Sequence, residues 1–168
     1  DVREYGSGNA GATNTFRVLG KGAGIPVLMM DVLKGWISVN YIYFITDGCN
    51  PFSETVTSSQ FEIQLALGIA AVIGHLFPIY TGFRGGKGIA TLLGLLIGLN
   101  YIAAIASIVV FVIVFLISKY VSLGSILASI AFPFVVFIIL DEKDINSSLQ
   151  LFSVFVPILT LITHQKNI

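Results

Sequence analysis

The sequence predicts an all-α, polytopic integral membrane protein. Of its 168 residues, 55% are hydrophobic and only 11% are charged, whereas a soluble domain usually carries about a quarter charged residues. A domain of this size cannot bury so much apolar surface in its own interior, and a lipid-facing exterior accommodates the excess. The hydrophobic residues also form runs of the length that a membrane-spanning helix needs, about 17 to 25 residues.

The apolar runs define six helical segments. They cover residues 24–45, 63–80, 89–99, 102–118, 121–140 and 149–163. Residues 89–118 can also be taken as one run, but about 30 residues are too many for a single untilted crossing, and the polar pair Asn100-Tyr101 interrupts them. Taken as two helices, the first measures only about 16 Å at 1.5 Å per residue. Segment 89–99 is therefore expected to be a half-span or to lie in a thinned region of the bilayer.

The distribution of charge between the loops favours two helices over one. The basic loops carry Arg3, Arg17, Lys21, Arg84, Lys87, Lys119 and Lys166, and the acidic or mixed loops carry Asp47, Glu54, Glu62, Asp141, Glu142, Lys143 and Asp144. If residues 89–118 crossed the membrane once, Lys119 and Lys166 would lie opposite the other basic residues. Two helices place every basic loop on one face, which the positive-inside rule identifies as cytoplasmic.

The remaining composition excludes several classes of protein. Nine basic and nine acidic residues balance, so the charge predicts no nucleic-acid partner. The lone Cys49 excludes an intramolecular disulfide and disfavours a cysteine-ligated metal site, and no metal or other cofactor is expected. Without an internal repeat, residues 1–168 are expected to form a single membrane-embedded domain. Because the chain begins with Asp1 rather than Met, we interpret it as a piece of a longer protein.

The first polar cluster, GSGNAGATN at residues 6–14, has three competing interpretations. Gly6, Gly8 and Gly11 match the G-x-G-x-x-G dinucleotide fingerprint, with Asp31 20 residues beyond the last glycine. That fold needs a strand before the glycines and a parallel sheet, yet only five residues precede Gly6. The second interpretation is a flexible juxtamembrane loop. The third is a phosphate site, because glycine amides, small polar side chains and a guanidinium all bind phosphate oxygens. Its candidate residues are Ser7, Gly8, Asn9, Gly11, Thr13, Asn14 and Arg17.

The second cluster, residues 74–91, places two cations in a glycine-rich loop before a helix. The candidate phosphate-binding residues are Arg84, Gly85, Gly86, Lys87 and Gly88. A helix N-terminus adds an anion site of its own. A nucleotide-binding P-loop is excluded because Thr81 stands where that motif has glycine, and Gly88 where it has serine or threonine. The competing interpretation is a basic loop that only sets the membrane topology. A histidine near the end of a span, as His75 is, is more often structural than catalytic.

Two ionisable residues, Asp31 and Lys34, lie inside the first span. Their spacing of three places them on one helical face. Within a membrane such groups are costly, usually face the protein interior and often pair. We interpret them either as a structural ion pair or as residues that orient the site.

The third cluster, His164-Gln165-Lys166-Asn167, ends the last span. His164 and Asn167 share a face if the helix continues. The predicted topology places this cluster on the same membrane face as the first two. Three polar clusters on one face, each suited to phosphate binding or proton transfer, predict a single site.

These clusters resemble the motifs of the bacterial acyl-phosphate:glycerol-3-phosphate acyltransferases, the PlsY family. SGNAGATNTFR (7–17), with the following Asp31-x-x-Lys34-Gly35, is similar to the family's first motif, GHLFPIYTGFRGGKGIAT (74–91) to its second and HQKN (164–167) to its third. The resemblance covers essentially the whole chain in order, although Ala10 stands where the family commonly has proline, which affects loop stiffness. Members have seven transmembrane helices, so the resemblance implies that this chain lacks the first helix and the basic C-terminal tail.

The resemblance implies acyl transfer from an acyl phosphate to the 1-hydroxyl of glycerol 3-phosphate. The implied catalytic residues are Ser7 and Arg17 for phosphate in the first motif, Lys87 in the second, and His164 and Asn167 to complete the site, with Asp31, Lys34 and His75 supporting them. The implied setting is the bacterial inner membrane, with the site facing the cytoplasm. A soluble enzyme that makes acyl phosphate is an implied partner, whereas acyl-CoA and acyl carrier protein are not implied donors.

The residue types suit that reaction. An acyl phosphate is a mixed anhydride with a good leaving group, so no covalent nucleophile is needed. The protein must neutralise and orient two phosphates and exclude water. The proton of the acceptor hydroxyl can pass to His164 or to a phosphate oxygen of the donor, and the sequence leaves both routes open.

Two alternative functions use the same clusters. One is a membrane transporter of a phosphorylated anion, although transporters usually have internal repeats and a binding site near mid-membrane. The other is a membrane transferase that acts on phosphorylated headgroups without acyl chemistry.

Overall fold

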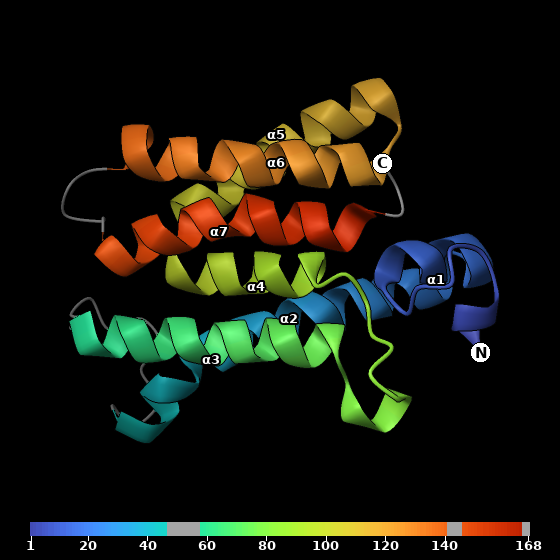
Figure 1. Cartoon of the computed structure of the whole chain (residues 1–168), viewed down its shortest axis with the longest axis horizontal. Coiled ribbons are helices and arrows are strands. Elements are labelled where there is room, and N and C mark those ends of the chain that lie inside the picture. The colour runs from blue at the N-terminus through green and yellow to red at the C-terminus, as the bar shows by residue number, and fades with distance from the viewer. Residues whose placement is uncertain (47–57, 141–145, 166–168) are drawn as a thin grey trace. The chain divides into compact units, whose positions relative to one another are not determined.

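The computed structural model describes residues 1–46, 58–140 and 146–165, and every regular element within these ranges is helical (Figure 1). The chain divides into two compact units, Asp1–Leu99 and Asn100–Ile168, and each is described by itself. The first contains α1 (Ala12–Leu19), α2 (Lys21–Thr46), α3 (Ser58–Leu76) and α4 (Ile89–Leu99), with short 3₁₀ helices η1 (Val2–Glu4) and η2 (Ile79–Thr81). The second contains α5 (Tyr101–Ser118), α6 (Val121–Phe134), the π-helix η3 (Val135–Ile139) and α7 (Ser147–His164).

The predicted membrane-spanning architecture is confirmed. Among the described residues, five helical stretches are long and apolar enough to cross a bilayer, and Ile89–Leu99 is a shorter apolar helix. The predicted break between 99 and 102 is also present. Asn100 leaves the helical conformation, and its side-chain oxygen accepts a hydrogen bond of 2.9 Å from the Ala103 amide, which caps the N-terminus of α5.

The structure differs from the predicted boundaries at the two glycine-rich clusters. The prediction has no helix before residue 24, but α1 begins at Ala12, so the last three residues of the first cluster are helical. The second span was expected to reach residue 80, but α3 ends at Leu76. Pro78 follows at once, and proline disfavours continuation of a helix because it lacks an amide donor. The loop between α3 and α4 is consequently longer than the sequence suggests.

Glycines allow α2 and α4 to pack closely in the first unit. A Cβ added to Gly35 would overlap the carbonyl of Thr91, and one added to Gly94 would overlap the carbonyl of Val32. Small residues commonly permit such backbone contact between helices in membranes. Val39 of α2 and Leu95 of α4 are fully buried in this unit. The close α2–α4 contact fixes α4 and hence the end of the loop that leads into it.

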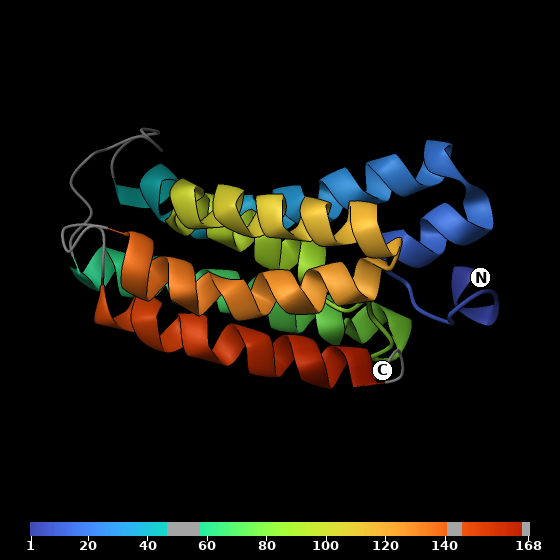
Figure 2. The same cartoon turned by 90° about the horizontal axis from the view of Figure 1, so that it is seen from above.

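In the second unit, α6 packs against both α5 and α7 (Figure 2). Phe132 and Phe152 meet edge to face with ring centroids 6.4 Å apart. Pro133 removes one backbone donor from α6, and the helix continues as the π-helix η3 immediately afterwards.

The close packing of α2 on α4 predicts a position-specific response to an added methyl group. Gly94→Ala should destabilise the full-length protein by about 1–3 kcal/mol, because the new Cβ overpacks against the backbone of α2. Gly74→Ala is the matched control: its Cβ meets nothing within 4 Å, so it should be neutral or stabilising by up to about 1 kcal/mol. Thermal unfolding in detergent measures both, and equal midpoints for the two variants would contradict the packing.

Candidate functional site

The buried side chain of Asn14 holds the first loop together through hydrogen bonds. Its side chain is 1% exposed. The carboxamide oxygen accepts from the Ser7 amide at 2.8 Å, and the nitrogen donates to the carbonyls of Val2, Tyr5 and Asn9 at 2.9, 3.1 and 3.0 Å. The predicted phosphate ligand Asn14 therefore contacts the loop backbone itself, and its position suits shaping the loop.

The backbone amides of this loop are also engaged within it. Gly8 donates to the carbonyl of Tyr5 at 3.1 Å, and Gly11 donates to the side-chain oxygen of Asn9 at 2.8 Å. Gly6 and Gly8 have φ of +63° and +69°, which favours glycine at both positions. The donors that face solvent are instead side chains, because Ser7, Thr13 and Arg17 are all exposed.

The second loop folds back on the end of α3. Gly85 donates to the carbonyl of Leu76 and Gly86 to that of His75, both at 3.2 Å. A Cβ on Gly86 would overlap the His75 ring, so only glycine allows this approach. The predicted phosphate-binding amides of Gly85 and Gly86 thus complete the C-terminus of α3. Gly88 has φ of +78°, and α4 begins directly after it.

The two glycine-rich loops meet at their tips. The Cβ position of Gly11 lies 3.8 Å from the Cα of Gly86 and 3.9 Å from the amide nitrogen of Lys87. Burial of the Lys87 amine, with a further contribution from the positive charge of Arg17, lowers the pKa of Lys87 below its ordinary value. The first and second motifs therefore form one surface in the first unit, as the sequence predicts.

Arg17 and Lys87 have no carboxylate partner in the part of the chain that the structure describes. The ion pairs there join Asp1 to Arg3, and Asp31 to Lys34 and His75. Arg84 is exposed in the same loop and likewise takes no part in these pairs. Two neighbouring cations without a counter-ion attract an anion with at least two charged oxygens.

The predicted contact between Asp31 and Lys34 is confirmed and has a third member. The Lys34 ammonium lies 2.6 Å from the Asp31 carboxylate and also contacts Nδ1 of His75, which is 3.3 Å from that carboxylate. Asp31 and His75 are largely buried, whereas Lys34 is partly exposed. Because His75 also abuts Gly86, this ionic triad supports the turn that precedes Lys87. Among the described residues, no group of three His, Cys, Asp or Glu side chains could hold a metal ion.

His164 ends α7 in the second unit, and its side chain is buried. Nδ1 lies 2.8 Å from the carbonyl of Thr160. Since a carbonyl only accepts, Nδ1 carries the proton and Nε2 is the basic nitrogen of the neutral ring. The proposed partner Asn167 falls outside the described residues. That His164 lies close to the two glycine-rich loops stays a prediction.

The whole chain, residues 1–168, matches the model of the glycerol-3-phosphate acyltransferase family. The chain belongs to this family. It is 44% identical over 151 residues to a glycerol-3-phosphate acyltransferase of Chlorobaculum tepidum, a match that covers 89% of this chain and 64% of that protein. It is 41% identical to the one of Staphylococcus haemolyticus, covering 100% of this chain and 79% of that protein. The chain thus spans less than two thirds of the length of some relatives it matches.

Two solved structures of a glycerol 3-phosphate acyltransferase have the same fold as this chain. The crystal structure of PlsY (YgiH), an integral membrane glycerol 3-phosphate acyltransferase in its glycerol 3-phosphate form, matches with a TM-score of 0.81 at 32% identity, covering 99% of this chain and 76% of that one. Its lysophosphatidic acid form matches with a TM-score of 0.76 at 32% identity, covering 96% and 74%. Membership of the acyltransferase family therefore agrees with the membrane helices and with the resemblance of the three motifs.

Two residues near the two glycine-rich loops were missed by sequence reasoning. Thr91, in the first turn of α4, is fully buried, and its hydroxyl has no hydrogen-bond partner among the described residues. The sequence feature that could have identified Thr91 is its hydroxyl four residues after Lys87. Arg3 was counted only as a basic loop residue, yet it donates to the carbonyl of Thr81, 78 residues away. No sequence pattern links residues so far apart.

The contacts among Asp31, Lys34 and His75 predict a non-additive loss of stability when the charges are removed. Asp31→Leu should cost about 3 kcal/mol of stability, because it leaves the Lys34 ammonium without its carboxylate partner within a membrane span. The double variant Asp31→Leu/Lys34→Met should be more stable than Asp31→Leu alone, since it removes both charges together. Thermal unfolding of the full-length protein in detergent measures Asp31→Leu, Lys34→Met and the double variant. A double variant whose loss equals the sum of the single losses would show that the two charges act independently.

Proposed function

We propose that the full-length protein transfers an acyl group from an acyl phosphate to the 1-hydroxyl of glycerol 3-phosphate. The products are 1-acyl-glycerol 3-phosphate and phosphate, and the reaction is the first acylation of phospholipid synthesis. The observation that carries the proposal is a pair of cations without a carboxylate partner among the described residues: Arg17, in the last turn of α1, and Lys87, in the loop before α4, where the first and second motifs meet at Gly11 and Gly86. Family membership supports the same reaction class.

The reaction balances without a covalent enzyme intermediate. The 1-hydroxyl oxygen attacks the acyl carbon, and the bond between that carbon and the phosphate oxygen breaks. Phosphate leaves with the electron pair. The hydroxyl proton passes either to Nε2 of His164 or to a phosphate oxygen of the donor, so both routes found in the sequence remain part of the proposal.

The proposed role of each described residue follows from its location. Arg17 and Lys87 bind the phosphate of glycerol 3-phosphate, and the exposed hydroxyls of Ser7 and Thr13 add hydrogen bonds beside it. Exposed Arg84 attracts the anionic substrates to the second loop. Because many backbone amides of both loops are engaged internally, side chains carry most of the binding. We assign His164 and Asn167 to the reacting centre as members of the same site.

The proposed cellular setting follows from the charges and the donor. The basic loops predict that the site faces the cytoplasm at the inner membrane of a bacterium, where glycerol 3-phosphate is soluble and the acyl chain stays in the bilayer. A soluble enzyme that makes acyl phosphate is the proposed partner. The transporter alternative gains no support from the described structure, because Arg17 and Lys87 lie at helix ends rather than within a span.

An assay with purified full-length protein, palmitoyl phosphate and glycerol 3-phosphate tests the proposal. Wild-type protein should form lysophosphatidate well above the uncatalysed rate. Arg17→Ala and Lys87→Ala should each lower kcat/KM by about 100-fold or more, as expected for loss of a charged contact to a bound phosphate. Lys21→Ala removes another exposed cation of the first unit and should change it less than about threefold.

Two results would overturn the proposal. Absence of lysophosphatidate with folded wild-type protein would refute the reaction. Full activity in both Arg17→Ala and Lys87→Ala would refute the site while leaving the reaction in place.

A further inference from the structure

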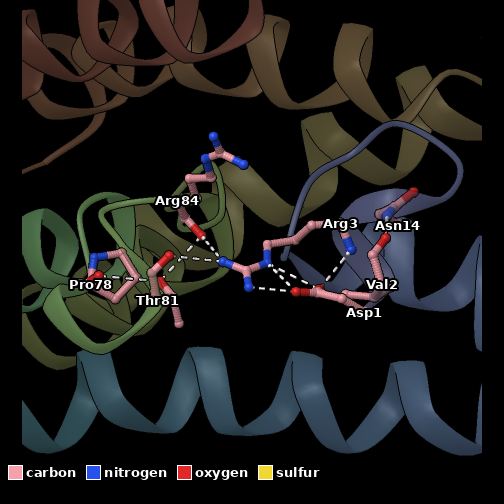
Figure 3. A network of polar contacts seen from close by, with 7 residues as sticks. All are labelled: Asp1, Val2, Arg3, Asn14, Pro78, Thr81 and Arg84. Carbon is pink, nitrogen blue, oxygen red and sulfur yellow. Dashed lines mark hydrogen bonds and ion pairs between the residues drawn. The ribbon is translucent and has the colours of Figure 1, made fainter.

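Arg3 joins two loops that are distant in the sequence (Figure 3). Its Nη1 donates to the carbonyl of Thr81 at 2.9 Å and to that of Arg84 at 3.5 Å. The other side of the guanidinium is held by Asp1, whose carboxylate oxygens both lie 3.0 Å from Nε of Arg3. The planar fork of arginine suits such simultaneous contacts, because its donors point in fixed directions.

The segment that carries Arg3 is itself fixed to α1. Asn14 donates to the carbonyls of Val2 and Tyr5, on either side of Arg3. Asn14 is buried on α1, one turn before Arg17. A continuous series of contacts therefore runs from α1 through Asn14 and Arg3 to the segment 81–84, three residues before Lys87.

Apart from Arg3, the loop bonds to itself and to the end of α3: Phe83 donates to the carbonyl of Pro78 at 3.0 Å, and Gly85 and Gly86 donate to those of Leu76 and His75. Tyr80 is 92% exposed and Phe83 60% exposed, and Phe83 adopts a left-handed φ of +61°, which is unfavourable for a bulky residue. An open cleft of about 350 Å³ lies beside it, lined by Asp1, Arg3, Glu4, Thr81, Gly82 and Arg84. Arg3 spans the two sides of this cleft, so it ties the exposed loop to the first motif.

The charge of Arg3 does not suit it to bind the substrate. Asp1 neutralises it through close contact, unlike Arg17 and Lys87. Its nitrogen donors are directed at backbone carbonyls and a carboxylate, which leaves its contribution geometric. The distance between the two cations depends on how the loops are held, and small misplacements of binding groups reduce catalysis strongly.

We propose that Arg3, oriented by Asp1, is a positioning residue that holds the loop of residues 81–88 against the first motif and so sets Lys87 beside Arg17. This inference rests on the proposed function, because the two cations are taken to bind the phosphate of glycerol 3-phosphate. It assigns a role to the contact between the segments 1–3 and 81–84, which neither the motifs nor the reaction requires.

Steady-state kinetics of the full-length protein with glycerol 3-phosphate and palmitoyl phosphate test the role. Arg3→Gln should raise the KM for glycerol 3-phosphate about tenfold, because it loses the fork that holds the loop. Asp1→Asn should raise it less. The double variant should match Arg3→Gln alone, since both residues act through one network. Arg3→Lys keeps the charge without the fork, so its KM should lie between those of wild type and Arg3→Gln.

The matched control is Lys21→Gln, which removes one exposed positive charge from the first unit without touching either loop. It should leave the KM within about twofold of wild type, and thermal unfolding identifies any variant that loses folded protein. An unchanged KM in folded Arg3→Gln, or a rise equal to that of Lys21→Gln, would overturn the positioning role. If Arg3→Gln does not fold, Arg3→Lys and Asp1→Asn carry the same test. Inactive wild-type protein would refute the proposed function instead, so the two failures are distinguishable.

Discussion

Arg17 and Lys87 carry positive charges that interact across the contact between the first and second motifs, no carboxylate balances them in the described chain, and the contacts within the first unit position them. Like charges repel, and burial of an amine adds a desolvation penalty, so both effects lower the pKa of Lys87. Such a pair is unfavourable in the empty protein and becomes favourable when a dianion lies between the cations. Under the proposed function, the same groups that destabilise the empty site supply the affinity for a phosphorylated substrate, a trade-off common at functional sites.

The loops that flank these charges are held in place because many of their backbone groups make internal contacts. Asn14 binds four backbone groups of the first loop, and the second loop completes the C-terminus of α3 through Gly85 and Gly86. Below the second loop, the Asp31–Lys34–His75 triad places paired charges in a membrane span, where isolated ones would be costly. The glycines therefore chiefly allow backbones to approach closely and turns to adopt a positive φ. The side chains at the loop surface are left to contact a ligand.

Much of the fold was predictable because lipid imposes simple rules on sequence. Helix length, apolar runs and the charge of loops gave the spans, and the short α4 followed from Asn100, whose side chain caps α5. The site residues were predictable only as types in clusters. That Asn14 would turn inward, that His75 would join Asp31 and Lys34, and that Arg3 would reach Thr81 depend on contacts between distant segments. Sequence periodicity carries no information on such contacts, because it reports only which face of one element is apolar.

The most direct test of the paired-cation site is chemical protection of Lys87. The full-length protein is treated with an amine-acylating reagent at mildly alkaline pH, with and without glycerol 3-phosphate, and modification of each lysine is followed by mass spectrometry. The lowered pKa of Lys87 increases the fraction of its amine that is unprotonated, and so able to react, at a given pH. A bound phosphate should raise that pKa and cover the amine, so glycerol 3-phosphate should slow modification of Lys87 about tenfold or more while exposed Lys21 reacts as before. Equal modification of Lys87 with and without a saturating concentration of glycerol 3-phosphate would contradict the account.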